Sequence, residues 1–193
     1  ARSTDYSGVI VFDGTGNSGA GYGYVRLSQD FYADFSGGIT ISIWANIATG
    51  TGGWSRLIDF ALGMEGNDNF LIGSWGNNPN DLIMQFWDGN GSGTGIIGLS
   101  AIAFDQWKLY TLTGDGSGYY WYINDQLSND LSGLSFLPNS SLRPGANCRI
   151  GGSNFAADPN LKGSIASVEI YNRALSTAEI TGLYNERKGR FGL

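Results

Sequence analysis

Hydrophobic and polar positions alternate in short runs along most of this chain, and glycine-rich stretches separate the runs. In residues 39–44 the side chains of Ile39, Ile41 and Ile43 fall on one face, at the period of two that a β-strand requires. Trp44 falls on the other face, so we expect a central strand that is covered on both sides at that end. Similar patterns predict further strands at residues 9–12, 22–27, 56–62, 70–75, 82–87, 96–103, 107–113, 119–124, 148–150 and 164–171.

The connections between these runs are rich in glycine, asparagine and aspartate, the residues typical of turns between antiparallel strands. Asn124 and Asp125 stand between residues 119–123 and 126–127, which is the spacing of a two-residue hairpin loop. The sequence therefore predicts an antiparallel pair of strands at this point.

One helix is predicted, close to the end of the chain. Ser176 and Glu179 have the spacing of a capping box, in which each side chain accepts a backbone N–H of the first turn. Ile180, Leu183 and Tyr184 follow as a single apolar stripe, and Gly189 is expected to end the helix. Many short strands, one late helix and no strand–helix–strand rhythm predict one all-β domain over residues 1–193, an antiparallel β-sandwich of the jelly-roll type.

Composition narrows the chemistry that the chain can carry. Its 193 residues include 31 glycines, a single cysteine and no histidine, and the formal net charge is −6. Without histidine the chain cannot build a Ser-His-Asp or Cys-His site, and with one cysteine it cannot form an internal disulfide. That cysteine, Cys148, is expected to be a small buried residue of a strand. The acidic balance and the lack of a long apolar run argue against binding to nucleic acid and against insertion into a membrane.

Several motifs follow one another in a distinctive order along nearly the whole chain. They are Val-Phe-Asp-Gly at 11–14, Tyr-Val-Arg-Leu at 24–27, Trp-Lys-Leu-Tyr at 107–110, Trp-Tyr-Ile-Asn-Asp at 121–125, Arg-Ile-Gly-Gly at 149–152 and the closing run at 163–176. In this order they resemble the laminin-G-like domains of the concanavalin-A-like lectin/glucanase superfamily. More narrowly, residues 56–60, 67–69 and 184–192 resemble laminin-G-like modules on bacterial surface proteins and on virion proteins of aquatic phages.

No catalytic residue is predicted. In the glucanase branch of the family that this chain resembles, a Glu-x-Asp-x-Glu strand places two carboxylates on either side of the glycosidic bond. None of the four glutamates, Glu65, Glu169, Glu179 and Glu186, belongs to such a triplet. Lyases of this fold need a histidine or tyrosine base among basic residues, and the tyrosines of this chain lack that setting. We therefore expect a protein that is not an enzyme.

Calcium is the metal that this composition can hold, because it takes about six to eight oxygen ligands and the turns are rich in Asp and Asn. The candidate ligands of one structural Ca²⁺ ion are Asp13 and the run Asn67, Asp68 and Asn69. The alternative is that these side chains only stabilise their turns. The family commonly carries an acidic residue where this chain has Ala166, which weakens the case for calcium at that position.

A glycan site needs an aromatic face for the sugar ring and amide or carboxylate groups for its hydroxyls. Trp54, Trp75 and Trp87 stand beside polar loops, and Asn78 and Asp81 follow in the loop after Trp75. These five residues form the candidate ligand-binding site. The alternative for each tryptophan is packing in the core or beneath a loop. The remaining tryptophans lie inside apolar strands and are expected in the core: Trp44, Trp107 and Trp121.

Two functions of different classes are compatible with this reading. The first is a non-catalytic, lectin-like adhesion module that binds a glycan or surface polysaccharide outside the cell. The alternative is a structural or decoration protein on the surface of a virion or cell, whose loops or sheet edges contact a capsid, tail or cell-surface protein lattice. Such a protein would bind no free sugar, so a glycan array run with and without calcium separates the two.

Overall fold

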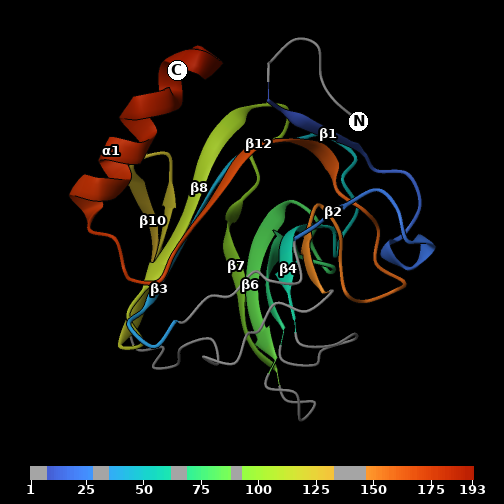
Figure 1. The fold of residues 1–193 in the computed structure, drawn as a ribbon, viewed down its shortest axis with the longest axis horizontal. Helices are drawn as coiled ribbons and strands as arrows, with labels where there is room; N and C mark the ends of the chain where they lie inside the picture. Colours follow the sequence, from blue (N-terminus) through green and yellow to red (C-terminus); the bar gives the residue numbers. More distant parts are fainter. Residues whose placement is uncertain (1–7, 28–34, 62–68, 88–92, 133–146) are drawn as a thin grey trace.

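Two six-stranded sheets pack face to face in a computed structural model that describes residues 8–27, 35–61, 69–87, 93–132 and 147–193 (Figure 1). Of residues 87, 93–100 and 132 it describes the backbone alone. The first sheet has the order β1 (Ile10–Asp13), β12 (Lys162–Tyr171), β3 (Ile39–Ile47), β8 (Trp107–Gly114), β9 (Gly118–Ile123) and β10 (Gln126–Ser132). The second has the order β2 (Val25–Arg26), β11 (Cys148–Ile150), β4 (Arg56–Phe60), β5 (Phe70–Ser74), β6 (Asp81–Trp87) and β7 (Gly93–Ala101).

All neighbouring strands in both sheets are antiparallel. This confirms the predicted β-sandwich. The strands β1 and β2 are each an edge strand of their sheet, and both lie on the same side of the molecule (Figure 1). The Asn124–Asp125 hairpin is also confirmed, because Ile123 of β9 pairs with Gln126 of β10 and Asn124 adopts a positive φ of 59°.

The core lies between the two sheets and follows the predicted alternation. Ile39, Ile41 and Ile43 of β3 are fully buried in it, and burying such a side chain contributes about 1.5–3 kcal/mol. Trp121 of β9 belongs to the same core, as expected. Cys148 is buried in β11, which confirms its predicted role.

The other face of β3 is covered by the C-terminal segment, as the position of Trp44 predicts. The helix α1 (Thr177–Arg187) lies beside the first sheet (Figure 1) and is followed by a 3-10 turn at Lys188–Phe191. The Trp44 ring stacks on Tyr184 and on Phe191, with centroid distances of 5.9 and 4.5 Å, and Phe191 also stacks on Trp107 at 4.5 Å. Trp44 and Trp107 are therefore buried, as predicted, but on the helix side of the sheet.

The helix begins as the sequence predicts, and a 3-10 turn that was not predicted follows its end. Ser176 is its N-cap, and the capping box with Glu179 is complete. The α-helix ends at Arg187, and the 3-10 turn then runs through Gly189 to Phe191. Gly192 takes the left-handed conformation, with φ 71°. In the described part of the chain, no helix combines the length and the apolar character needed to cross a membrane.

Candidate functional site

Two loops that carry predicted sugar-binding residues lie against each other. The backbone N–H of Trp54 donates to the carbonyl of Ser74 (3.1 Å), and the N–H of Trp75 donates to the carbonyl of Asp81 (2.8 Å). The N–H of Asp81 in turn donates to the carbonyl of Asn78 (2.9 Å). The structure thus brings together four of the five candidates, namely Trp54, Trp75, Asn78 and Asp81.

The Trp54 side chain is half-buried and held from two directions. Its residue has a positive φ of 65°, a conformation that non-glycine residues seldom adopt. The guanidinium carbon of Arg56 lies 5.3 Å from the centroid of the indole ring. Gly76 lies so close to the Nε1 side of the ring that any side chain at position 76 would overlap the indole. The loop after Trp75 therefore fixes the orientation of the Trp54 ring.

Asn78 and Asp81 form the polar part of the same surface. The Asn78 Nδ2 donates to the Asp81 Oδ2 at 2.7 Å, and both side chains are half-buried. Among the described residues, no group donates to the Asp81 Oδ1.

Trp87 is the fifth candidate of the predicted sugar site. Its backbone lies in β6, but its side chain is outside the described part of the structure.

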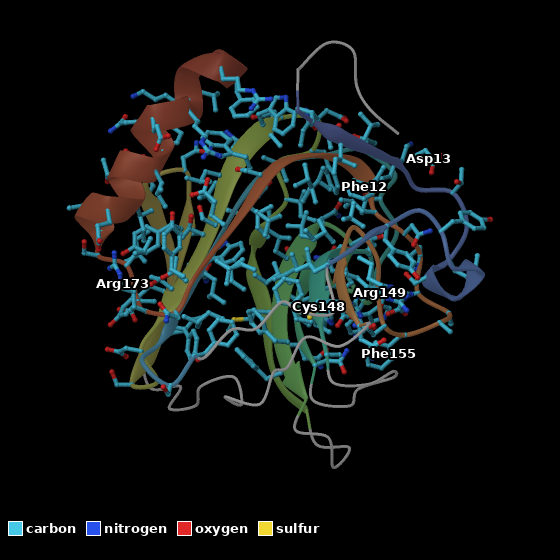
Figure 2. The ribbon with its side chains drawn as sticks, in the orientation of Figure 1. Phe12, Asp13, Cys148, Arg149, Phe155 and Arg173 are labelled. Atoms are coloured by element: carbon cyan, nitrogen blue, oxygen red, sulfur yellow. The ribbon has the colours of Figure 1, made fainter. Side chains whose placement is uncertain are left out.

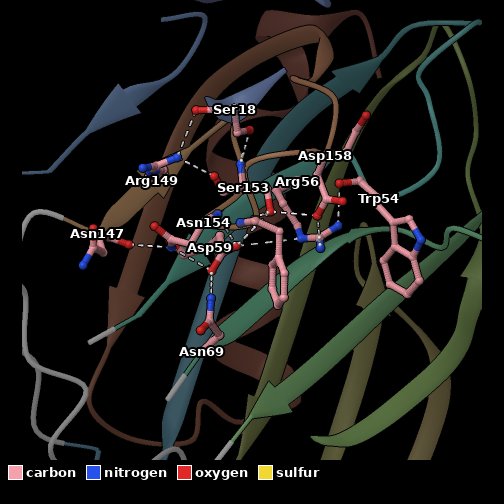
Figure 3. A network of polar contacts seen from close by, with 12 residues as sticks. Ser18, Trp54, Arg56, Asp59, Asn69, Asn147, Arg149, Ser153, Asn154 and Asp158 are labelled. Atoms are coloured by element: carbon pink, nitrogen blue, oxygen red, sulfur yellow. Dashed lines mark hydrogen bonds and ion pairs between the residues drawn. The ribbon is translucent and has the colours of Figure 1, made fainter. Parts of the chain in front are cut away.

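A buried network of charged and polar side chains lies beside Trp54 (Figure 3). The Arg56 Nη2 donates to the Asp158 Oδ2 at 2.8 Å, and the Arg56 Nε lies 3.9 Å from the Asp59 Oδ2. Arg56 also donates to the carbonyl of Trp54. The Ser153 hydroxyl donates to both carboxylates, at 2.9 Å to Asp158 and 3.3 Å to Asp59. Trp54 is therefore joined to the network through Arg56.

Asp59 is the centre of this network and is fully buried. Its carboxylate accepts the Asn154 backbone N–H (2.8 Å), the Asn154 Nδ2 (3.0 Å) and the Asn69 Nδ2 (2.8 Å). Burial raises the pKa of Asp59 and lowers the pKa of Arg56, because both charged forms lose water, while their mutual attraction opposes both shifts. The donors around Asp59 replace part of the hydration that its carboxylate has lost.

Reasoning from the sequence missed this network, although a signal for it exists. Arg56 and Asp59 interrupt an otherwise apolar strand, and Arg149 interrupts another. A charged residue in a strand that is buried at every position requires a partner, because an unpaired buried charge is strongly destabilising. The partner Asp158 lies 102 positions from Arg56 in the sequence. No local pattern could therefore identify it.

The two calcium candidates whose structure is described, Asp13 and Asn69, make hydrogen bonds to different residues. The Asp13 Oδ1 accepts the N–H and the hydroxyl of Thr15, which is the arrangement of a self-stabilised turn. Asn69 is buried and donates to Asp59, while Asn67 and Asp68 lie outside the described residues. Among the described side chains, no cluster of three or more acidic, histidine or cysteine residues could hold a metal ion. Ala166 lies at a register shift between β12 and β3. Calcium binding stays a prediction.

Comparison with protein families and known structures gives a consistent assignment. A laminin G family model, described as the concanavalin A-like lectin/glucanases superfamily, matches residues 18–181. No curated protein matches this chain at a significant level.

Three solved structures share the fold at low sequence identity. One is domain 4 of AbnA, an extracellular arabinanase from Geobacillus stearothermophilus solved with arabinotriose, with TM-score 0.64, 17% identity, and coverage of 91% of this chain and 76% of that chain. The CBM40 of a Ruminococcus gnavus sialidase, solved with α2,3-sialyllactose, has TM-score 0.60, 18% identity, and coverage of 83% and 96%. The botulinum neurotoxin serotype G binding domain has TM-score 0.59, 16% identity and coverage of 94%, but this chain spans only 45% of that one.

Proposed function

The chain belongs to the concanavalin A-like lectin/glucanases superfamily, and on this premise we propose that it is a carbohydrate-binding module. The proposed module acts without catalysis, outside the cell or on the surface of a cell or virion. Two of the structures that share its fold were solved with a bound oligosaccharide. The observation that carries the proposal is the joining of Trp54, Trp75, Asn78 and Asp81 by two adjacent loops.

These loops combine the two kinds of group that sugar recognition uses. Trp54 and Trp75 are half-buried, so each ring keeps part of its surface for contact with a pyranose. Asn78 and Asp81 place an amide and a carboxylate in the same loop surface, where they can bind hydroxyls. Because Gly76 and Arg56 fix the Trp54 ring in advance, little side-chain entropy is lost when a sugar binds.

The carboxylates of the buried network support a role without catalysis. Asp59 and Asp158 are neighbouring carboxylates, since both accept from the Ser153 hydroxyl, and a pair of acids is what glycosidases use. However, Asp59 is 0% exposed and both carboxylates bind Arg56. A glycosidic bond cannot enter between them, so this pair serves to hold loops.

A glycan array that includes arabinan fragments and sialylated oligosaccharides tests the proposal, run once in calcium and once in chelator. We expect Trp54→Ala and Trp75→Ala each to abolish binding, because each removes a stacking face. Both variants should lower the melting temperature far less than Trp121→Ala, whose fully buried ring contributes about 3–5 kcal/mol.

The matched controls are Trp54→Phe and Trp75→Phe, which keep an aromatic face and should keep part of the affinity. If no glycan binds the wild type, and both alanine variants are destabilised as much as Trp121→Ala, the two tryptophans are packing residues. The carbohydrate-binding proposal then fails, and the surface-structural alternative takes its place.

A further inference from the structure

A pocket lies away from the tryptophan loops, between the edge strand β1 and residues 22–25. Its volume is about 280 Å³, and its lining includes Tyr22, Tyr24, Asp13 and Thr15 together with aliphatic residues of β1 and β2. Neither Trp54 nor Trp75 contributes to it. Figure 2 shows Asp13 at the periphery of the molecule on this side, next to Phe12, whose side chain is buried in the core.

Tyr22 presents an aromatic face to solvent. Its side chain is 58% exposed, although a tyrosine ring normally gains stability from burial. The ring lies against Gly16, which has a φ of 73° and leaves room for the tyrosine because it has no side chain. Tyr22 is therefore a supported aromatic surface at the mouth of the pocket.

Asp13 supplies the polar group of the pocket. Its Oδ1 accepts the backbone N–H of Thr15 at 2.9 Å and the Thr15 hydroxyl at 2.7 Å. Among the described residues, none donates to the Oδ2. The carboxylate is thus fixed in orientation, and one of its oxygens can accept a hydrogen bond from a ligand.

The loop that carries these groups is clamped from inside the protein. The buried Asn160 Nδ2 donates to the carbonyls of Thr15 (3.0 Å) and Tyr22 (3.1 Å), so one side chain ties both ends of the loop. The Asn160 Oδ1 accepts the hydroxyl of Ser18 (3.1 Å), and the Ser18 hydroxyl oxygen accepts the N–H of Ser153 (2.7 Å).

The second tyrosine of the pocket is fixed by the same buried network. The Arg149 guanidinium carbon lies 4.4 Å from the centroid of the Tyr24 ring, and Gly152 leaves no space between its backbone and Tyr24. Arg149 donates to the carbonyls of Ser18 and Ser153 (Figure 3), which fixes the guanidinium beneath the ring. Both tyrosines are thus in place before any ligand arrives, which reduces the entropy that binding must overcome.

We propose that this pocket is a second carbohydrate site, which binds a single neutral pyranose residue. Tyr22 stacks on the sugar ring, and the Asp13 Oδ2 accepts a ring hydroxyl. The proposal rests on the proposed carbohydrate-binding function and extends it to a second position.

Size and charge define the class of sugar. The pocket is slightly smaller than the range of about 300–1,000 Å³ typical of drug-sized ligands, so it suits one sugar residue better than an extended chain. Asp13 is the charged residue in the lining of the pocket, while the guanidinium groups of Arg26 and Arg149 contact Tyr24 from outside that lining. The fixed carboxylate lies on the Tyr22 side, where it repels an acidic sugar that stacks on this ring. Neutral pyranoses are therefore preferred over sialic acid.

Titration followed by backbone amide NMR tests the proposal. The neutral probes are methyl β-D-galactopyranoside, methyl β-D-glucopyranoside and methyl α-D-mannopyranoside, and the acidic probe is the methyl glycoside of N-acetylneuraminic acid. We expect at least one neutral glycoside to shift the amides of Thr15, Tyr22 and Gly23 with a millimolar Kd. The acidic glycoside should leave these amides unchanged in the wild type.

Three variants separate the roles of the two lining residues. Tyr22→Ala should weaken the neutral glycoside at least about tenfold while the melting temperature stays close to that of the wild type, because the ring is mostly exposed. Tyr22→Phe keeps the stacking face and should bind nearly as well. Asp13→Asn should weaken the neutral glycoside several-fold and reduce the discrimination against the acidic one.

Trp54→Ala keeps this experiment separate from the test of the first site. We expect that variant to bind the neutral glycoside at Tyr22 as the wild type does, even where it has lost array binding. The proposal is overturned if no neutral glycoside shifts the Tyr22 region, or if Tyr22→Ala binds with unchanged affinity. Neither result bears on the proposed sugar site at the tryptophan loops, which the glycan array tests separately.

Discussion

Two regions of the molecule are held in place by different kinds of interaction. On the outer face of the first sheet, the C-terminal segment is held mainly by stacked rings of Trp44, Trp107, Tyr184 and Phe191. On the side of β2 and β11, the loops are held by directional bonds among buried polar groups centred on Asp59. We call the first region the aromatic cover and the second, which consists of the residues labelled in Figure 3 other than Trp54, the polar clamp.

The two regions differ in what they fix. Stacked rings attract over a range of geometries, so the aromatic cover can keep a helix in place without setting the position of every atom. Hydrogen bonds require donor and acceptor at a set distance and angle, so the polar clamp fixes the backbone of the loops that it joins. Both proposed carbohydrate sites adjoin the polar clamp, one through Trp54 and Arg56, the other through Tyr24 and Arg149.

Among the variants that compare the two regions, Arg56→Met is expected to have the largest effect on stability. The variant leaves Asp59 and Asp158 without their shared cation, and an uncompensated buried carboxylate should lower the free energy of unfolding by about 3–5 kcal/mol. Urea unfolding followed by tryptophan fluorescence measures the change.

The matched control is Arg173→Met. It breaks the 2.6 Å ion pair with Glu179, whose partners are 53% and 42% exposed, and should lower the free energy of unfolding by less than about 1 kcal/mol. Similar losses in the two variants would show that the polar clamp is no more important than a surface ion pair.

A moderate effect is expected in the aromatic cover, from Phe191→Ala. Phe191 is half-buried between Trp44 and Trp107, so its removal should lower the free energy of unfolding by about 2 kcal/mol, less than the loss of a fully buried Phe. Phe191→Leu fills part of the same space and should restore much of the loss. If Phe191→Ala destabilises the protein more than Arg56→Met, the aromatic cover contributes more to stability than the polar clamp, contrary to our expectation.

The smallest effect concerns the helix start and depends on pH. The hydrogen bond from Arg173, and then those from Ser176, lower the pKa of Glu179 from its ordinary value of 4.5 to about 2. Since the native state holds the ionised form, this stabilisation is present above pH 4.5 and is lost as the pH falls towards 2. The melting temperatures of wild type and Glu179→Gln should therefore differ at pH 7 and converge near pH 2.

Ser176→Ala is the control for this titration, because it removes the N-cap acceptor and should cost about 1 kcal/mol. It should lower the melting temperature at pH 7 even though it leaves the Glu179 carboxyl in place. A gap between wild type and Glu179→Gln that stays constant down to pH 2 would contradict the assignment of the pH effect to Glu179.

Features governed by local pattern could be predicted from the sequence. The alternation of Ile39, Ile41 and Ile43 identifies β3, and the spacing of Ser176 and Glu179 identifies the helix start, because both depend on residues a few positions apart. The α-helix ends at Arg187 with Lys188 as its C-cap, just before Gly189 as predicted. The 3-10 turn that follows was not predicted, because it depends on the packing of Phe191 against Trp44 of the sheet.

Features governed by distant contacts could not be predicted in this way. Asn69, a candidate calcium ligand from the sequence, is buried and donates its amide to Asp59 of the neighbouring strand, a contact that no local pattern indicates. The pocket beside β1 depends on Asn160, which lies 138 positions from Tyr22. The tryptophan loops are an intermediate case: composition singled out their residues, and only the structure shows that Gly76 and Trp54 interlock.

The single cysteine, Cys148, can be used to measure how often β11 opens locally, because its thiol is buried in that strand. Burial raises the pKa of this thiol to about 11, so the reactive thiolate is scarce while β11 stays paired with β4. A thiol reagent can modify the protein only when β11 separates from the sheet, and no second cysteine in the sequence adds a background signal. The labelling rate therefore reports how often the strand that carries Arg149 leaves its place.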